Sequence, residues 1–184
     1  MSKAELVKLF KEMAMAEMFI GNSPFKSRTY LFAAESVEKY GLKVEILENI
    51  RGIGKAILNK TSEYLKMGKI KKHDYLMELI PRKYSELLTI ENARALGKEW
   101  KSIVIKRFFN EDGTLKSLPS KHSLRFYVLK DIASYFKRNR VYTEMEVNEI
   151  LSNIHEDNVA LRRYLIDYGF LKRTKDGSEY RRGD

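Results

Sequence analysis

The segment NIRGIGKAILNK, residues 49–60, places two glycines one residue apart before a predicted helix, in a chain that has ten glycines. Glycine allows φ above zero and close approach of another backbone, so this turn can direct its N–H groups outward while Ile53 packs inward. The positive end of the following helix adds to the attraction for an anion. Gly52, Ile53 and Gly54 therefore predict a binding site for one nucleic-acid phosphate that makes no contact with the bases.

The Gly-x-Gly pattern also has a purely structural interpretation, because a tight turn between two helices needs the same glycines. The phosphate interpretation is favoured by a group of lysines on and after the predicted helix. These are Lys55, Lys60, Lys69, Lys71 and Lys72.

Lys60 is the candidate for covalent chemistry. A lysine acts as a nucleophile when burial or neighbouring cations lower its pKa enough to leave part of it neutral near pH 7. At 100° per residue, Lys60 lies at the edge of the apolar face of Ile57, Tyr64 and Leu65, which suits a pocket. The same position suits a surface lysine with a packed stem, or a plain phosphate contact.

The whole chain is basic. Its 184 residues carry 35 Lys and Arg against 25 Asp and Glu, and residues 1–100 and 101–184 each contribute +5 of the net +10. This excess of positive charge favours binding to a nucleic-acid backbone, because neutralising phosphates releases their counterions. An acidic protein or a membrane surface could also bind a basic chain.

Several other classes of protein are disfavoured by the sequence. Without cysteine, neither a disulfide framework nor a thiolate metal site can form, and His73, His122 and His155 lack ligand spacing, so we expect no metal site. Charges interrupt every apolar stretch, which predicts a soluble, intracellular protein that does not bind membranes.

Helical periodicity dominates the first half. We predict helices over residues 2–21, 24–41, 45–48, 55–68 and 69–81, and two short helical pieces over 84–88 and 90–100. Ser2 with Glu5 predicts a capping box at the first of these helices.

The second half combines helices with extended segments. A short extended arm is predicted over 104–109 and 114–121, on either side of the turn NEDG, because that turn is rich in turn formers and Pro119 cannot lie inside a helix. Helices are predicted over 124–137, 143–154 and 157–168. Thr143 with Glu146 predicts a second capping box, and Asp176-Gly177 predicts a β-hairpin. Three helices followed by a hairpin is the order of a winged helix. The predicted fold class is mostly α, with domains at 1–100 and 101–184.

The helix predicted over 157–168 has an apolar face that includes Leu161 and Leu165, which leaves Asn158, Arg162 and Arg163 outward. Arginine pairs with guanine and asparagine with adenine in the major groove, so this helix is a candidate for reading bases. The alternative is a solvated face on a domain that contacts protein. The predicted hairpin would bring further cations to DNA phosphates: Lys172, Arg173, Lys175, Arg181 and Arg182.

The segments NSPFKSRTYLFAAESVEKYG and ENIRGIGKAILNKTSEYLKMGKIKKHDYL resemble the N-terminal lyase domain of the family X DNA polymerases, the polymerase beta type, over residues 3–100. The resemblance implies a helix-hairpin-helix fold. It also implies phosphate binding by the turn at Gly52, Ile53 and Gly54, with a monovalent cation held by backbone carbonyls when DNA is bound, and no other cofactor.

The same resemblance implies that Lys60 forms a Schiff base with the sugar of an abasic site, and that Lys26, Tyr30 and Lys72 flank a 5′-phosphate pocket. Arg51 stands where the family usually has proline, and Ala56 where the animal enzymes have lysine. The segment LLTIENARALGKEW lacks the glycines of the family's second hairpin, and no carboxylate constellation of the polymerase palm follows residue 100. We therefore expect no DNA synthesis.

The segments FFNEDGTLKSLPSK, YTEMEVNEIL and DNVALRRYLIDYGFLKR resemble an uncharacterised bacterial domain family that is often fused behind ArsR-type winged-helix repressors. This resemblance implies a regulatory association and no particular activity.

The sequence thus predicts a cytoplasmic, nucleoid-associated protein that binds duplex or gapped DNA, in transcriptional regulation or as an accessory of DNA repair. Two alternatives stay open. One is a 5′-deoxyribose phosphate or abasic-site lyase with Lys60 as nucleophile, and the other is an adaptor that binds a protein partner.

Overall fold

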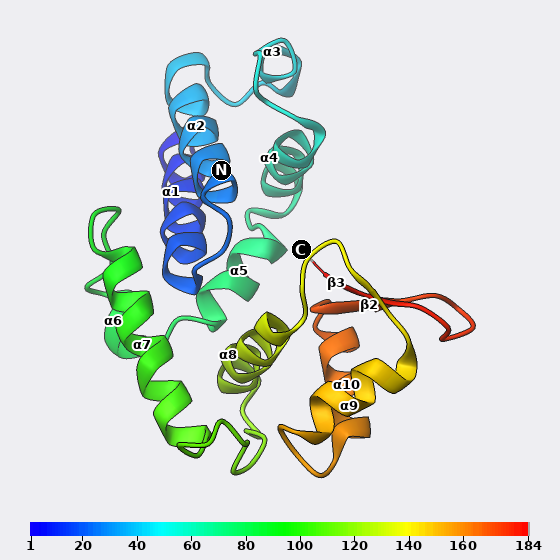
Figure 1. Ribbon diagram of the computed structural model, residues 1–184. Helices are drawn as coiled ribbons and strands as arrows, with labels where there is room; N and C mark the ends of the chain where they lie inside the picture. Colours follow the sequence, from blue (N-terminus) through cyan, green and yellow to red (C-terminus); the bar gives the residue numbers. More distant parts are fainter. Residues whose placement is uncertain (184) are drawn as a thin grey trace. The chain divides into compact units, whose positions relative to one another are not determined.

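The computed structural model describes residues 1–183, which divide into two compact units between Trp100 and Lys101. Figure 1 shows the helices and strands. The first unit contains α1 (Lys3–Ile20), α2 (Pro24–Tyr40), α3 (Val44–Leu47), α4 (Lys55–Met67), α5 (Lys71–Glu78), α6 (Arg82–Ser85) and the beginning of α7 (Ala93–Phe108). The second contains the end of α7, then α8 (His122–Ile132), a 3-10 turn (Ala133–Tyr135), β1 (Val141–Tyr142), α9 (Glu144–Ser152), α10 (Asn158–Asp167), β2 (Leu171–Arg173) and β3 (Tyr180–Arg182).

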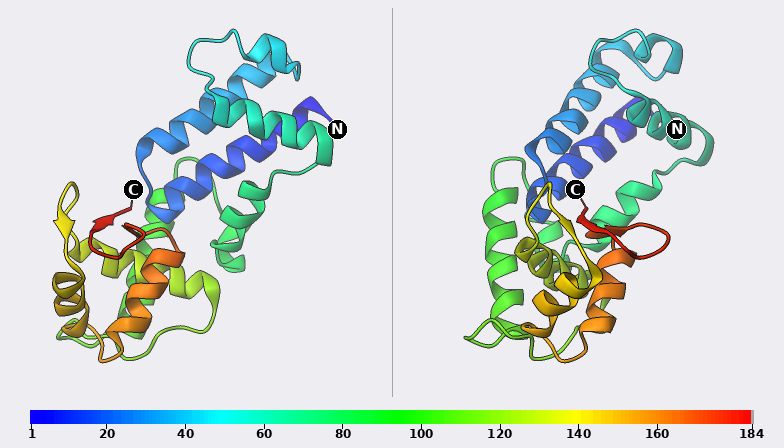
Figure 2. Two further views of the ribbon diagram at one scale, coloured as in Figure 1. Left: turned by 90° about the vertical axis from the view of Figure 1, so that its right-hand side faces the viewer. Right: turned by 45° about the vertical axis from the view of Figure 1, so that its right-hand side comes forward.

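The first unit is built around α1 and α2, which lie side by side in every view (Figures 1 and 2). Gly21 ends α1 with φ 71°, a left-handed conformation that glycine adopts without strain. Pro24 starts α2 almost at once, so α2 returns along α1. The ring of Phe10, fully buried, then stacks on the ring of Tyr30 with 6.2 Å between centroids.

Tyr64 joins α4 to the beginning of α1. Ser2 caps α1 by accepting a hydrogen bond from the Glu5 amide at 3.1 Å, which is half of the predicted capping box. The other half is replaced, because the Ser2 amide donates to Tyr64 Oη at 2.9 Å and Glu5 Oε2 accepts from the Tyr64 hydroxyl at 2.6 Å. The fully buried Tyr64 thus positions the helix on which Lys60 lies.

Gly97 allows α7 to lie against the end of α1. A Cβ at this position would lie 1.9 Å from the carbonyl oxygen of Phe19, closer than any non-bonded contact. Ala93, one turn earlier on α7, is also fully buried. The segment that lacks the second Gly-x-Gly pattern therefore uses its one glycine for close helix packing.

The extended arm predicted over residues 104–109 is wrong up to Phe108, because α7 continues through it. Val104 and Phe108 are buried one helical turn apart, and this packing outweighs the β preference of the run Ile103-Val104-Ile105. Extended pairing is limited here to one bridge between Phe109 and Leu115, around the predicted NEDG turn.

The second unit combines helices with a three-stranded antiparallel sheet in the order β1-β3-β2. The predicted hairpin is present, with Lys172 of β2 opposite Arg181 of β3. The sequence missed β1, because two residues are too short to show an alternating pattern. Both hydrogen bonds of the capping box between Thr143 and Glu146 are present. The prediction of a mostly α fold with a small β-hairpin is confirmed.

Candidate nucleic-acid interface

The turn between α3 and α4 carries the Gly-x-Gly segment, and both glycines are exposed. Gly52 has φ 102°, which favours glycine, and a Cβ there would lie 3.0 Å from Cε1 of Phe32. Ile53 is buried, and its amide donates to the carbonyl of Ile50 at 3.0 Å. The turn therefore anchors itself through Ile53 and keeps its glycines at the surface.

Gly54 is the N-cap of α4, and no contact within residues 1–183 requires glycine there. Its φ of −96° suits any residue, and no atom lies within 4 Å of the position that a Cβ would take. Ser, Thr, Asp and Asn at an N-cap accept hydrogen bonds from first-turn amides, whereas glycine, which is also common there, has no side chain to do so. Gly54 accordingly provides no such bond. The first amides of a helix have no intrahelical partner. This end of α4 thus offers bare N–H groups and the positive end of its dipole to an approaching anion.

Close to α4, the side chains of four helices surround a cavity of ≈ 250 Å³. It brings together Lys26 and Tyr30 of α2, Lys60 of α4 and Lys72 of α5. In the sequence analysis, these four residues were placed near one another only by the resemblance to the lyase domain of the family X DNA polymerases. The lining is completed by Glu17, Phe25, Thr29, Ala56 and Ile57.

Lys60 is half-buried at the wall of this cavity. Its Nζ donates to the carbonyl of Ala56, one turn earlier, at 3.2 Å and lies 5.9 Å from the centre of the Tyr30 ring. Burial lowers the pKa of Lys60 below its usual value, although the carboxylates of Glu63 and Glu17 act in the opposite direction. The amine is therefore more readily neutral than that of an ordinary surface lysine.

Lys72 has a lowered pKa for related reasons. Burial is the largest cause, and the charges of Lys26 and Lys60 also lower the pKa, whereas Glu17 raises it. Three lysines thus line the cavity with a single carboxylate, that of Glu17. A cavity of this charge attracts an anion, and a bound phosphate would favour the charged form of each lysine near it.

Glu17 is the residue of this cavity that the sequence analysis missed. It lies in α1, is only 2% exposed, and its Oε2 accepts from Nδ2 of Asn22 at 2.6 Å. Burial, with a smaller effect of the Glu17 charge, raises the pKa of Tyr30 to about 12, so the phenol is neutral at ordinary pH. A signal was present, since Glu17 falls on the apolar stripe of Phe10 and Met13, where a carboxylate is unusual.

Phe25 and Thr29 also line the cavity without having been predicted, and Phe25 is 75% exposed. The predicted residues Lys55, Lys69 and Lys71 are exposed and lie outside the cavity lining. They add positive charge around the hairpin helix and form no part of the pocket.

In the second unit, Arg162 of α10 does not point outward as the periodicity indicated. Its Nη1 donates to Glu144 Oε1 at 2.7 Å and to Asn148 Oδ1 at 2.5 Å, and its side chain is 14% exposed. Asn158 donates from Nδ2 to the hydroxyl of Ser152 at 2.8 Å. Of the three predicted base-reading residues, Arg163 is the one that is exposed and has no polar partner within residues 1–183.

The predicted cations of the hairpin remain at the surface in most cases. Lys172, Arg173 and Lys175 are exposed, and Arg181 is exposed and paired with Glu179 at 3.2 Å. Arg182 is more enclosed, because its Nη1 donates to the carbonyl of Phe136 at 3.0 Å.

Two other kinds of feature were searched for in residues 1–183. No group of three or more His, Cys, Asp or Glu side chains is arranged to hold a metal ion. No helix in that part of the chain combines the length and apolar character needed to cross a membrane.

Comparison with known proteins divides the chain in a similar way. Residues 1–70 match the model of a family described as "Helix-hairpin-helix domain", and residues 114–182 match one described as "Uncharacterized protein conserved in bacteria (DUF2087)". No curated protein matches the chain significantly. The two matches confirm the helix-hairpin-helix domain in the first half and the uncharacterised bacterial domain in the second. They do not show the predicted links to polymerase beta and to ArsR-type repressors.

Proposed function

We propose that the chain is a DNA-binding protein whose first unit, residues 1–100, holds backbone phosphates at the turn of Gly52, Ile53 and Gly54. The observation that carries this proposal is the bare N-cap. Gly54 leaves the first amides of α4 without a side-chain partner, although there is room for a capping side chain within residues 1–183. A phosphate oxygen from outside the chain would fit both the exposed amides of α4 and the positive end of its dipole. The match to a helix-hairpin-helix family supports the same conclusion.

The cavity lined by Lys26, Lys60 and Lys72 extends the proposal to the end of a DNA strand. Its ≈ 250 Å³ exceeds what one phosphate needs and suits a terminal phosphate with its sugar. We therefore propose gapped or nicked DNA with a 5′-phosphate as the preferred ligand, over intact duplex. The cellular role that fits is an accessory of DNA repair or DNA-linked regulation near the nucleoid.

A gel-shift comparison of intact, gapped and abasic duplexes at two ionic strengths tests this proposal. We expect the gapped duplex with a 5′-phosphate to bind most tightly, and affinity to fall steeply with log salt. Negligible affinity for all three duplexes, or binding that is indifferent to salt, would refute the proposal and favour an adaptor that binds a protein.

A second candidate function is favoured by the lowered pKa of Lys60 in this cavity. In a 5′-deoxyribose phosphate or abasic-site lyase, the neutral amine of Lys60 would attack C1′ of the open-chain sugar and release water, giving a Schiff base. Loss of the C2′ proton to a base would then break the bond between C3′ and its phosphate oxygen. Glu17 is the carboxylate in the cavity lining that could accept this proton. Hydrolysis of the Schiff base would return the free lysine.

Borohydride reduction on an abasic-site oligonucleotide separates the two functions. A lyase gives a covalent adduct that disappears in Lys60→Ala and persists in Lys55→Ala, because Lys55 is exposed and lies outside the cavity lining. An adduct that survives Lys60→Ala would rule out Lys60 as the nucleophile. If no adduct forms and binding to gapped DNA is retained, the lyase function is excluded and only the DNA-binding function remains.

We further propose that residues 101–184 form a winged-helix domain. The order α8, β1, α9, α10, β2 and β3, with β3 central in the sheet, supports this interpretation. Two DNA-binding units on one chain increase affinity through effective concentration, even when each is weak alone.

A further inference from the structure

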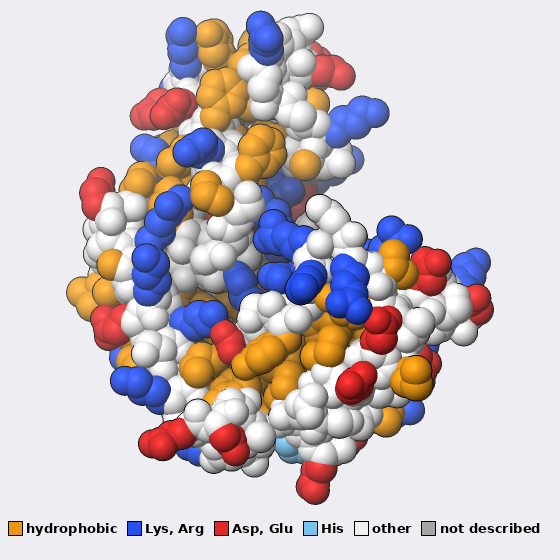
Figure 3. Space-filling model, viewed as in Figure 1, with side chains coloured by type: hydrophobic (Ala, Val, Ile, Leu, Met, Phe, Trp, Pro, Cys, Tyr) orange, Lys and Arg blue, Asp and Glu red, His pale blue; other side chains and the backbone are white. Residues whose placement is uncertain are grey.

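Charge is unevenly divided among the elements of the second unit. Residues 137–142 and 171–182, which hold the strands and the adjoining loops, contain eight Lys or Arg and two Asp or Glu. Residues 144–168, which hold α9 and α10, contain two Arg and six Asp or Glu. In Figure 3, Lys and Arg side chains gather over the region of β2 and β3, and Asp and Glu toward α9 and α10. A polyanion is therefore attracted to the strands and repelled by the helix pair.

The loop of residues 137–140 leads into β1 and is fastened at its base. The Lys137 amide donates to Tyr142 Oη at 2.6 Å, and Arg182 donates to the carbonyl of Phe136 at 3.0 Å. Asn139 has φ 59°, a conformation that asparagine adopts more readily than most residues. The side chains of Lys137 and Arg138 are exposed and have no polar partner within residues 1–183. The loop thus presents two unneutralised cations from a fixed position.

The solvent face of the sheet carries a pair of like charges. Lys172 and Arg181 lie directly opposite each other on β2 and β3, and such pairs destabilise a sheet. Val141, next to Arg181 on β1, is 39% exposed, whereas Tyr142 and Tyr180 in the neighbouring row are buried. Glu179 offsets part of this repulsion through its ion pair with Arg181 at 3.2 Å, and a bound phosphate would offset it further.

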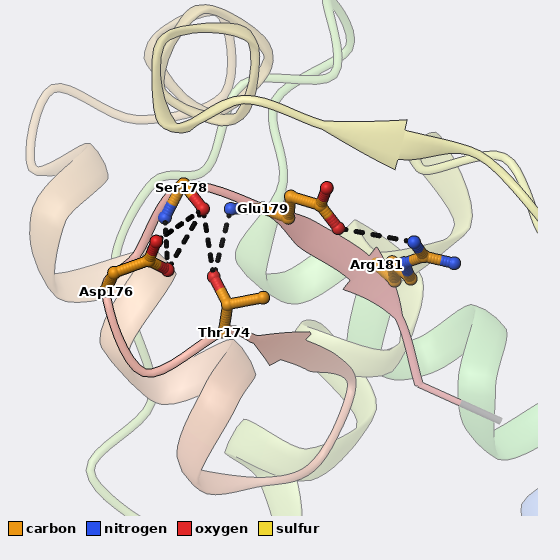
Figure 4. Close-up of polar contacts among 5 residues, drawn as sticks. All are labelled: Thr174, Asp176, Ser178, Glu179 and Arg181. Carbon is orange, nitrogen blue, oxygen red and sulfur yellow. Dashed lines mark hydrogen bonds and ion pairs between the residues drawn. The ribbon is translucent and has the colours of Figure 1, made fainter.

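The tip of the hairpin is closed by side-chain hydrogen bonds, which Figure 4 shows. The carboxylate of Asp176 accepts from the Ser178 hydroxyl at 2.9 Å, and the Glu179 amide donates to Thr174 Oγ1 at 3.2 Å. Hydrogen bonds from Thr174 and then Ser178 hold the pKa of Asp176 below its usual value. The Asp176 carboxylate is therefore charged at neutral pH and can accept these hydrogen bonds.

We propose that the second unit binds the phosphate backbone of duplex DNA through the sheet surface, meaning Lys172 and Arg181 of the strands together with Lys137 and Arg138 of the loop that leads into β1, and that α10 does not read bases. The proposal takes DNA as the polyanion from the function proposed for the first unit. Arg162 is engaged by α9 and Asn158 by Ser152. The sheet surface offers cations, which contact phosphates without distinguishing sequences.

A matched pair of substitutions in the full chain tests the proposal. Arg138→Ala and Arg163→Ala each remove one exposed, unpaired arginine from the second unit, so they change the net charge equally. Affinity is measured by fluorescence anisotropy over a range of salt concentrations, on two duplexes of unrelated sequence. We expect Arg138→Ala to make the negative slope of log affinity against log salt shallower by about 0.9 on both duplexes. Adding Lys137→Ala should double the reduction, and Arg163→Ala should leave the slope unchanged.

Each other outcome overturns the proposal in a distinguishable way. A reduced slope in Arg163→Ala with none in Arg138→Ala would place the contact on α10. Unchanged slopes in both variants, with binding lost in Gly54→Asp, would confine DNA to the first unit and leave the function proposed there intact. Binding to vesicles of anionic phospholipid without binding to DNA would end both proposals. Thermal unfolding checks that each variant is folded.

Discussion

Replacing Gly54 with aspartate separates the folding of the hairpin from its binding of an anion. Gly54→Asp gives α4 the capping side chain that it lacks, at a φ of −96° and with free space around the Cβ position. An N-cap aspartate stabilises a helix by a few tenths of a kcal/mol relative to glycine. Its charge at the positive end of the helix adds about 0.3–1 kcal/mol. We expect the free energy of unfolding to rise by about 0.5–1 kcal/mol.

The same carboxylate would stand where a DNA phosphate is expected. Two unit charges 4 Å apart repel by about 1 kcal/mol in water and by about 4 kcal/mol at the effective dielectric constant of a protein surface. With about 1.4 kcal/mol for each factor of ten, DNA affinity should fall between roughly fivefold and several hundredfold. Stability and DNA affinity should therefore move in opposite directions.

Urea denaturation measures the first quantity and fluorescence anisotropy with a gapped duplex the second. Gly54→Ser is the matched control, because serine also caps the helix and carries no charge. It should retain the part of the gain that comes from capping, a few tenths of a kcal/mol, and lose less affinity than the aspartate. If Gly54→Asp is more stable and binds DNA as tightly as the wild type, the amides of α4 do not hold a phosphate and the proposed function is wrong.

Three further substitutions test other features. Gly97→Ala should lower the free energy of unfolding in urea by about 1–3 kcal/mol or more, because its Cβ would overlap a carbonyl of α1; a neutral result would mean that α7 packs elsewhere. Glu17→Gln should lower the pKa of both Lys60 and Lys72 further, because the carboxylate that opposes the effect of burial is removed; NMR titration of methylated lysines would contradict this if either pKa rose. In the wild type, the folded state binds fewer protons at these two lysines than the unfolded state does, so their contribution to stability should increase with pH up to about 10.5, the value for an unfolded lysine. Arg162→Ala should lower the free energy of unfolding by about 1–2 kcal/mol without changing the salt slope of DNA binding, since Arg162 joins α10 to α9; a reduced slope would return this arginine to the DNA contact.

Local sequence signals predicted much of the first unit. Gly21, Pro24 and Gly68 mark helix ends because a left-handed cap and a fixed φ are properties of single residues. The same reasoning located the turn at Gly52 and the hairpin at Gly177. The prediction of an extended segment at 104–108 is wrong, because the NEDG turn and Pro119 indicate where a helix must end and do not show what precedes the turn, which depends on packing.

The grouping of residues around the cavity and the orientation of Arg162 on α10 depend on contacts between distant segments, which helical periodicity does not show. A helical stripe shows that Glu17 is buried, and it does not show that Lys60 and Lys72 are nearby. Periodicity likewise places Arg162 on an outer face. Its long side chain nevertheless turns back to Glu144, a partner on a different helix.

The division of charge between the strands and the helix pair gives the second unit an electric dipole. In the field of a line of negative charge, such a body turns before it makes contact, so more of its collisions begin in a productive orientation. Added salt should then slow association more than it speeds dissociation, and stopped-flow traces would separate the two rate constants. For this unit, orientation during approach would be set by charge placement before any single bond to DNA forms.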